Sequence, residues 1–245
     1  MNKSLIELDE YLDLHDFELV KKEFLDQIDS ISKKYLNIFY ANLSGTAEQE
    51  LIDYRKKVNV PETTFSFEKD DSFEFPENPG KMWTLYLKKI LDEVDLNYLL
   101  IDKSEYWVDL SIYNKFPKLK SMVSNLPFKN VSRIFFMFNK ESVNSGIHFD
   151  HNMEDWRQEF IWFRMNEAKK FYLLENNNHT YIQGSSCWFD AKIKHGSESD
   201  GFAASLRVDG EFTKEFREKS FGKNSKRETV TDLDRWNWNT EKYEK

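Results

Sequence analysis

The chain has 245 residues, of which 40% are hydrophobic and 16% aromatic, and this is enough to bury a core in one large domain. Its formal net charge of −8 argues against a general surface for nucleic acids or anionic membranes, so we expect neither as a partner. Cys187 is the only cysteine, which excludes an internal disulfide and fits a reducing compartment.

The first residues, MNKSLIELDEYLDLHDFELVKK, carry acids where a signal peptide would need an apolar run. No stretch approaches the roughly 20 apolar residues of a membrane span, so we expect a soluble cytoplasmic protein. Apolar residues recur at three- and four-residue steps through residues 4–57 and again through 81–100, which predicts helices. Between them, residues 59–80 form a Pro-punctuated acidic loop. We therefore expect residues 1–125 to be a helical and loop region that packs on a core.

The residue pattern changes from helical spacing to short strand-like runs towards the middle of the chain. EYWVDLSIY (105–113) begins a β-rich part, and from about residue 131 short runs such as RIFFMF, EFIWFRM and SCWFDA are separated by turn-forming residues. Strands this short and closely spaced predict a sandwich or barrel over residues 126–212 instead of a parallel α/β sheet. The tail, 213–245, is charged up to Trp236 and Trp238, which we expect to dock on the domain or, alternatively, to bind a partner.

The segment SGIHFDH (145–151) concentrates groups that could bind a metal. In a strand, His148 and Asp150 point to the same face, whereas in a helix His148 would pair with His151. A third ligand is available at His195, which leaves a predicted strand and precedes a glycine. Two imidazoles and one carboxylate on a β-scaffold are the ligand set of non-haem Fe(II), with coordination positions left open. The remaining histidines, His15 and His179, are expected at the surface.

Arg207 is a cation in an otherwise apolar strand, AASLRVDG, and Ser205 shares its face. A buried guanidinium needs a planar anion as partner. A dicarboxylate cosubstrate would supply one, because one end could chelate iron while the distal carboxylate meets Arg207 and Ser205. A salt bridge from Arg207 to a neighbouring acid, Asp209 or Glu211, is the alternative.

The spacing His148-Phe149-Asp150, then His195, then Arg207 resembles the Fe(II)- and 2-oxoglutarate-dependent dioxygenases, whose core is a double-stranded β-helix. FRMN (163–166), WFDAKIKHGSES (188–199) and SLRVDG (205–210) are similar to the aspartyl/asparaginyl β-hydroxylase-like branch. That resemblance maps Arg164 to an arginine that helps to hold the C1 carboxylate of 2-oxoglutarate, although an ion pair with Glu159 or Glu175 is an alternative. Asn166 stands where the branch often has a histidine.

The resemblance implies an α+β protein with a mainly β, jelly-roll or cupin-like core and N-terminal helices. It implies Fe(II) held by His148, Asp150 and His195, with 2-oxoglutarate as cosubstrate, contacted by Arg207, Ser205 and Arg164, and with O2. The expected reaction hydroxylates an amino acid or a peptide or protein residue, with succinate and CO2 as co-products. A zinc hydrolase using His148 and His151, or a non-catalytic cupin-like binding protein, are the alternatives.

Overall fold

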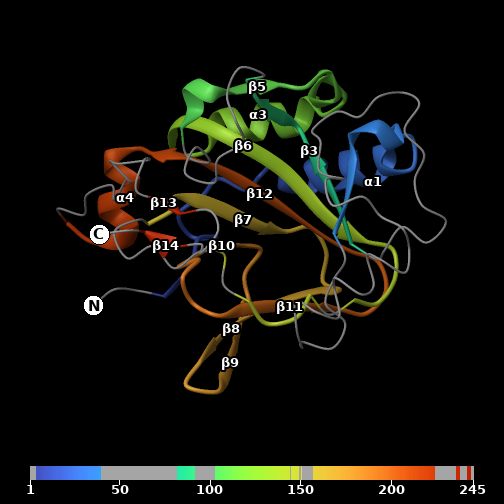
Figure 1. Cartoon of the computed structure of the whole chain (residues 1–245). Helices are drawn as coiled ribbons and strands as arrows, with labels where there is room; N and C mark the ends of the chain where they lie inside the picture. The colour runs from blue at the N-terminus through green and yellow to red at the C-terminus, as the bar shows by residue number, and fades with distance from the viewer. Residues whose placement is uncertain are drawn as a thin grey trace.

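The computed structural model describes residues 4–39, 82–91, 103–143, 145–148, 150, 157–223, 236–237 and 242–243. A large and a small β-sheet lie one above the other, with helices over the far side of the large sheet (Figure 1). The strands of the two sheets are β1 (Leu5–Glu7), β2 (Leu36–Phe39), β3 (Met82–Tyr86), β6 (Phe128–Asn139), β7 (Phe160–Arg164), β8 (Lys169–Glu175), β9 (Asn178–Tyr181), β10 (Ser186–Phe189), β11 (His195–Ser199) and β12 (Ala203–Phe212).

Two short hairpin-like pairs lie outside these sheets: β4 (Lys88–Ile90) with β5 (Trp107–Asp109), and β13 (Trp236–Asn237) with β14 (Lys242–Tyr243). The α-helices are α1 (Phe17–Ile28), α3 (Pro117–Asn125) and α4 (Lys214–Phe221), and the short 3-10 helices are η1 (Lys33–Tyr35), η3 (Ser104–Tyr106) and η4 (Ser111–Lys115). None of the helices in the described ranges is long and apolar enough to cross a membrane.

The large sheet is antiparallel in the order β1-β10-β7-β12-β6-β3-β2. Along its central strands, successive side chains point to opposite faces of the sheet. On β6, Phe136 packs against Phe24 of α1 with ring centroids 4.3 Å apart, whereas Phe135 and Met137 face the small sheet and line a cavity. The run RIFFMF is therefore apolar on both faces because both faces of this sheet are covered.

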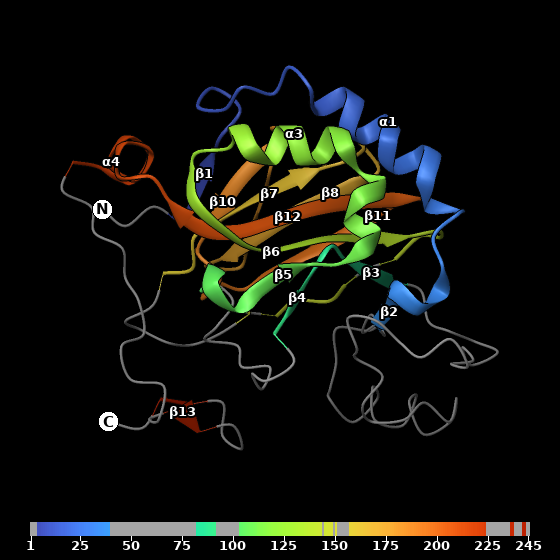
Figure 2. The same ribbon diagram turned by 90° about the horizontal axis from the view of Figure 1, so that it is seen from above.

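Helices α1 and α3 lie across the outer face of the large sheet (Figure 2). Phe17 and Phe24 of α1 pack on aromatic side chains of the sheet, Phe17 against Phe163 at a centroid distance of 5.3 Å and Phe24 against Phe136. The carboxylate of Glu23 accepts hydrogen bonds from the backbone N–H groups of Lys118 and Leu119 at 2.9 and 3.0 Å. Glu23 thus satisfies two of the N–H groups that the first turn of α3 leaves without an intrahelical acceptor.

The small sheet has the order β11-β8-β9, and a backbone bridge between His148 and His195 adds the 145–148 segment to its edge. Along the chain, the large sheet receives β6, β7, β10 and β12, and the small sheet receives the 145–148 segment, β8, β9 and β11. This alternation between two facing antiparallel sheets is the jelly-roll arrangement. The prediction of a mainly β core of the double-stranded β-helix type is confirmed.

The helical predictions for the N-terminal part were right only in places. The helix containing Phe17, Val20, Phe24 and Ile28 is present as α1, but Leu5–Glu7, Leu36–Phe39 and Met82–Tyr86 are strands β1, β2 and β3 of the large sheet. Each pairs with a strand distant in sequence, β1 with β10 and β3 with β6, so tertiary pairing outweighed the local helical spacing. The predicted helix after residue 46, the loop at 59–80 and Trp238 lie outside the described residues.

Candidate metal centre

His148, Asp150 and His195 are brought to one point by backbone pairing between two segments. His195 is the first residue of β11, and its N–H and C=O exchange hydrogen bonds of 2.7 and 2.9 Å with the C=O and N–H of His148. The N–H of Asp150 donates to the carbonyl of Ala191 at 2.9 Å. The loop that carries His148 and Asp150 is therefore fixed on both sides of Phe149 to the chain around β11.

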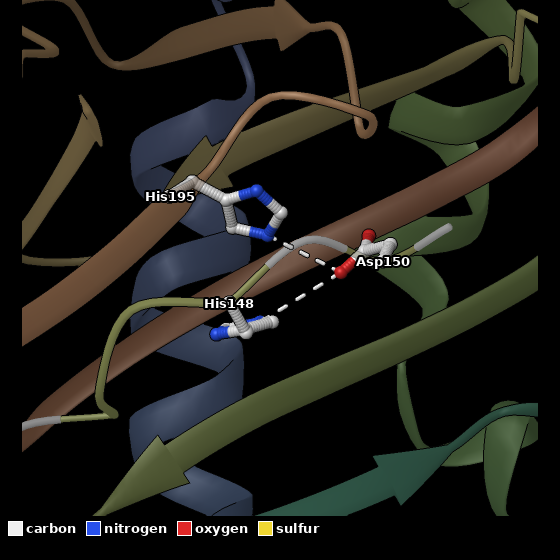
Figure 3. Close-up of side chains that lie close together, drawn as sticks. All are labelled: His148, Asp150 and His195. Carbon is white, nitrogen blue, oxygen red and sulfur yellow. Dashed lines mark hydrogen bonds and ion pairs between the residues drawn. The ribbon is translucent and has the colours of Figure 1, made fainter. Parts of the chain in front are cut away.

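The three side chains converge (Figure 3), and one ligand atom from each lies within 4.8 Å of the others. Oδ1 of Asp150 is 3.2 Å from Nε2 of His195 and 3.7 Å from Nε2 of His148, and the imidazole centroids are 4.5 Å apart. Atoms this close can share one metal ion. Two imidazole nitrogens and one carboxylate oxygen fit Fe(II), for which this set leaves further coordination positions open.

The hydrogen bonds of these residues suit metal binding. Nδ1 of His195 donates to the carbonyl of Ile193 at 2.8 Å, which turns Nε2 towards Asp150. Burial and the neighbouring His195 lower the pKa of His148, which favours the neutral imidazole. Burial alone would raise the pKa of Asp150, but the hydrogen bond with His195 and the charge of Arg207 outweigh it and hold the pKa well below its usual range. A neutral imidazole and an ionised carboxylate are the forms that bind metals.

A buried network of charges lies behind Asp150. Arg207 donates from Nη1 to Oδ2 of Asp150 and from Nε to Oδ1 of Asp209, both at 3.0 Å. Asp209 also accepts hydrogen bonds from Nε of Arg133 and Nε2 of Gln158, both at 2.9 Å. The network holds Oδ2 of Asp150 on the side of Arg207 and leaves Oδ1 facing the two histidines, which orients the carboxylate for binding through one oxygen.

The structure places the three residues predicted to contact 2-oxoglutarate in different surroundings. Arg207 lines the cavity, but two of its N–H groups are used by protein carboxylates and its guanidinium lies 3.8 Å from the ring centroid of Phe160. The salt-bridge alternative with Asp209 is thus present. Ser205 is buried on the same strand, and its Oγ has no hydrogen-bond partner in the described part of the chain.

Arg164 is engaged away from the metal centre. It donates to the backbone carbonyl of Gln183 and lies 3.7 Å from a carboxylate oxygen of Glu167. Within the described ranges, Arg164 forms neither ion pair suggested from the sequence: its acidic partner is Glu167, and Glu159 pairs with Arg217. Asn166 binds the backbone, accepting from the N–H of Ala204 at 3.3 Å and donating to the carbonyl of Phe202 at 3.0 Å. His151 lies outside the described residues.

The candidate metal centre opens into a cavity of about 370 Å³ between the two sheets, a volume typical of small-molecule sites. Its described lining combines apolar side chains with a few charged groups: Met82, Thr84, Tyr86, Arg133, Phe135, Met137, Ser145, His148, Asp150, Trp162, Lys169, Phe171, Phe189, His195, Ser197 and Arg207.

Lys169 is a charged lining residue that the sequence interpretation missed. It begins β8 and is 4% exposed, and its ammonium donates to Oγ of Ser197 at 2.9 Å. Burial lowers its pKa from 10.5 to about 8. The signal in the sequence was weak: in KKFYLLE the first lysine is in phase with Phe171 and Leu173, which are buried, whereas the second is out of phase and exposed.

No family model and no curated protein matches the sequence. Solved structures that are similar to the chain include a prolyl-4-hydroxylase from Pseudomonas putida, with 9% identity over 84% of this chain and 91% of that one and a TM-score of 0.41. A 2OG-Fe(II) oxygenase family oxidoreductase from Burkholderia pseudomallei has 11% identity, coverage of 86% and 94%, and a TM-score of 0.32.

A prolyl hydroxylase from Trichoplax adhaerens, in complex with a fragment of the hypoxia inducible factor oxygen degradation domain, has 13% identity, coverage of 87% and 96%, and a TM-score of 0.33. With TM-scores of 0.41 or less, these similarities do not identify the function of the chain.

Proposed function

We propose that the chain is an Fe(II)- and 2-oxoglutarate-dependent dioxygenase that hydroxylates an amino acid or a peptide or protein residue. The observation that carries the proposal is the convergence of His148, Asp150 and His195, within 4.8 Å of one another, at the wall of a cavity between two sheets. The aspartyl/asparaginyl β-hydroxylase-like branch, the cytoplasmic location and the cosubstrate contacts of Arg207, Ser205 and Arg164 are parts of the same proposal.

The iron, when bound, would couple the oxidative decarboxylation of 2-oxoglutarate by O2 to the oxidation of a C–H bond. In the balanced reaction, 2-oxoglutarate, O2 and R–H give succinate, CO2 and R–OH. The residues of the chain bind and orient: the two imidazoles and Oδ1 of Asp150 hold the metal, and Arg207 holds the other carboxylate oxygen. Phe171 and Phe189 pack beside His195, with ring centroids 5.5 and 4.9 Å from the imidazole, and shield that side of the centre.

The geometry counts against the zinc site that the sequence suggested, with His148 and His151 as its two histidines. The zinc hypothesis needs His148 and His151 on one helical face, whereas the described backbone at His148 is bridged to β11 in an extended arrangement and Asp150 completes the cluster. A carboxylate with two imidazoles fits an oxygen-activating iron site, and the same set also occurs in catalytic zinc sites, so metal analysis decides between the two ions.

Metal analysis of the full chain as purified without oxygen, followed by titration with Fe(II) and then 2-oxoglutarate, tests the proposal. We expect about one Fe(II) per chain, and an absorption band that appears when 2-oxoglutarate chelates the metal. Retention of zinc without such a band would support a hydrolase, and binding of neither metal would support a binding module. His179→Ala is the matched control, because His179 lies on β9 with its side chain exposed and outside the cluster.

A further inference from the structure

Lys169 is a buried cation that has no counter-ion among the residues that the structure describes. It is 4% exposed, and its one hydrogen bond goes to a neutral group, the hydroxyl of Ser197. No carboxylate in the described ranges lies within ion-pair distance of its ammonium. Burying an unpaired charge is costly, and buried lysines are ordinarily paired. The side chain of Lys169 lines the cavity and is therefore placed to receive an anionic ligand there.

The two arginines of the cavity are in the opposite situation. Arg207 is paired with Asp150 and Asp209, and Arg133 is paired with Asp209 as well. Two guanidinium charges thus meet two carboxylate charges, and this group is balanced within the protein. Among the described lining residues, the positive charge that remains for a ligand is that of Lys169.

The rest of the cavity also offers hydrogen-bond donors. Oγ1 of Thr84, Nε1 of Trp162 and Nη2 of Arg207 are all buried, and none has a partner among the residues that the structure describes. All three residues line the same cavity as Lys169. Donors without acceptors are satisfied by a ligand rich in oxygen atoms. The cavity is therefore suited to a carboxylate.

The position of Lys169 relative to the metal centre suits one end of a short diacid. Its partner Ser197 follows His195 by two residues on β11, and in that strand Ser197 lies opposite Phe171 while His195 lies opposite Leu173. Two residues of extended strand span roughly 7 Å. A ligand that chelates metal at His195 through one end can therefore direct its other end towards the ammonium.

We propose that Lys169 binds the distal carboxylate of the dicarboxylate cosubstrate, with Arg207 serving mainly to orient Asp150. This assignment rests on the proposed function. It makes Lys169 at the start of β8, instead of Arg207 on β12, the cation that recognises the distal carboxylate.

The test compares two ligands on the anaerobic, Fe(II)-loaded full chain: 2-oxoglutarate, and 2-oxopentanoate, which has the same chelating end but no distal carboxylate. A charge-assisted hydrogen bond in a shielded site makes the diacid bind roughly tenfold to a hundredfold more tightly. In Lys169→Met this preference should disappear, because 2-oxoglutarate loses affinity while 2-oxopentanoate and Fe(II) keep theirs. A merely structural role would weaken both ligands together. Lys170→Met, one residue along and exposed, should behave as the unaltered chain.

Lys169→Arg keeps the charge and should retain part of the preference. If Lys169→Met still prefers 2-oxoglutarate as strongly as the unaltered chain does, the assignment is overturned. If Arg207→Ala loses the preference instead, Arg207 on β12 binds the distal carboxylate. If Lys169→Met does not fold, Lys169→Gln is measured in the same way. An unaltered chain that holds iron but binds neither keto acid contradicts the proposed function itself, which separates the two failures.

Discussion

Removing the charge of Lys169 should stabilise the protein while it impairs ligand binding. Burial lowers the pKa of this lysine from 10.5 to about 8. Below pH 8 the ammonium is therefore charged in the folded state, where its free energy is higher than in the solvated, unfolded chain. The difference corresponds to about 3 kcal/mol of destabilisation. Methionine has a similar unbranched shape and no charge, so Lys169→Met should raise the free energy of unfolding by about 1–3 kcal/mol at pH 7.

The destabilisation by Lys169 should depend on pH. Between pH 8 and pH 10.5 the folded state releases the Lys169 proton before the unfolded state does, so the penalty fades as the pH rises and is absent above 10.5. Urea unfolding of the metal-free chain at pH 7 and at pH 10 should therefore show an advantage of Lys169→Met that is largest at pH 7. Lys170→Met should show no such change. A Lys169→Met variant that is less stable than the unaltered chain at pH 7, by a margin that is the same at both pH values, would refute the reasoning.

Three further substitutions test the surroundings of the site. His195→Ala should lose Fe(II) binding in an anaerobic titration and keep its far-ultraviolet circular dichroism spectrum. His179→Ala should bind iron normally, and iron bound equally by both variants would exclude His195 as a ligand. Arg207→Ala removes the hydrogen bond that holds Oδ2 of Asp150, so Fe(II) affinity should fall by roughly tenfold to a hundredfold, and unchanged affinity would mean that the bond does not orient the carboxylate. Glu159→Gln leaves a buried guanidinium without its carboxylate and should cost about 3 kcal/mol in urea unfolding, so a cost near zero would show the pair to be dispensable.

The parts of the protein that were predictable from the sequence depend on local patterns. The short aromatic runs of β6, β7 and β12 carry their own strand signal, and the helical spacing of Phe17 to Ile28 matches α1. The pairing of His148 with Asp150 also follows from a two-residue spacing. Predicting these features required no information about contacts between distant parts of the chain.

The parts that were missed depend on pairing between distant segments. β1 and β3 read as helices because their apolar spacing is ambiguous over so few residues, and only their positions beside β10 and β6 make them strands. The hydrogen bond between Arg207 and Asp150 joins residues 57 positions apart, so the contact of Arg207 with Asp150 could not be read from its strand. The burial of Lys169 likewise depends on the register of β8 against β11.

The central claim is tested most directly by measuring succinate formed from 2-oxoglutarate by the Fe(II)-loaded full chain. Without its own substrate, the protein should form succinate slowly, and only when O2, Fe(II) and 2-oxoglutarate are all present. The rate should fall to background in His195→Ala and persist in His179→Ala. Succinate at background levels in the unaltered chain, with iron demonstrably bound, would contradict the account.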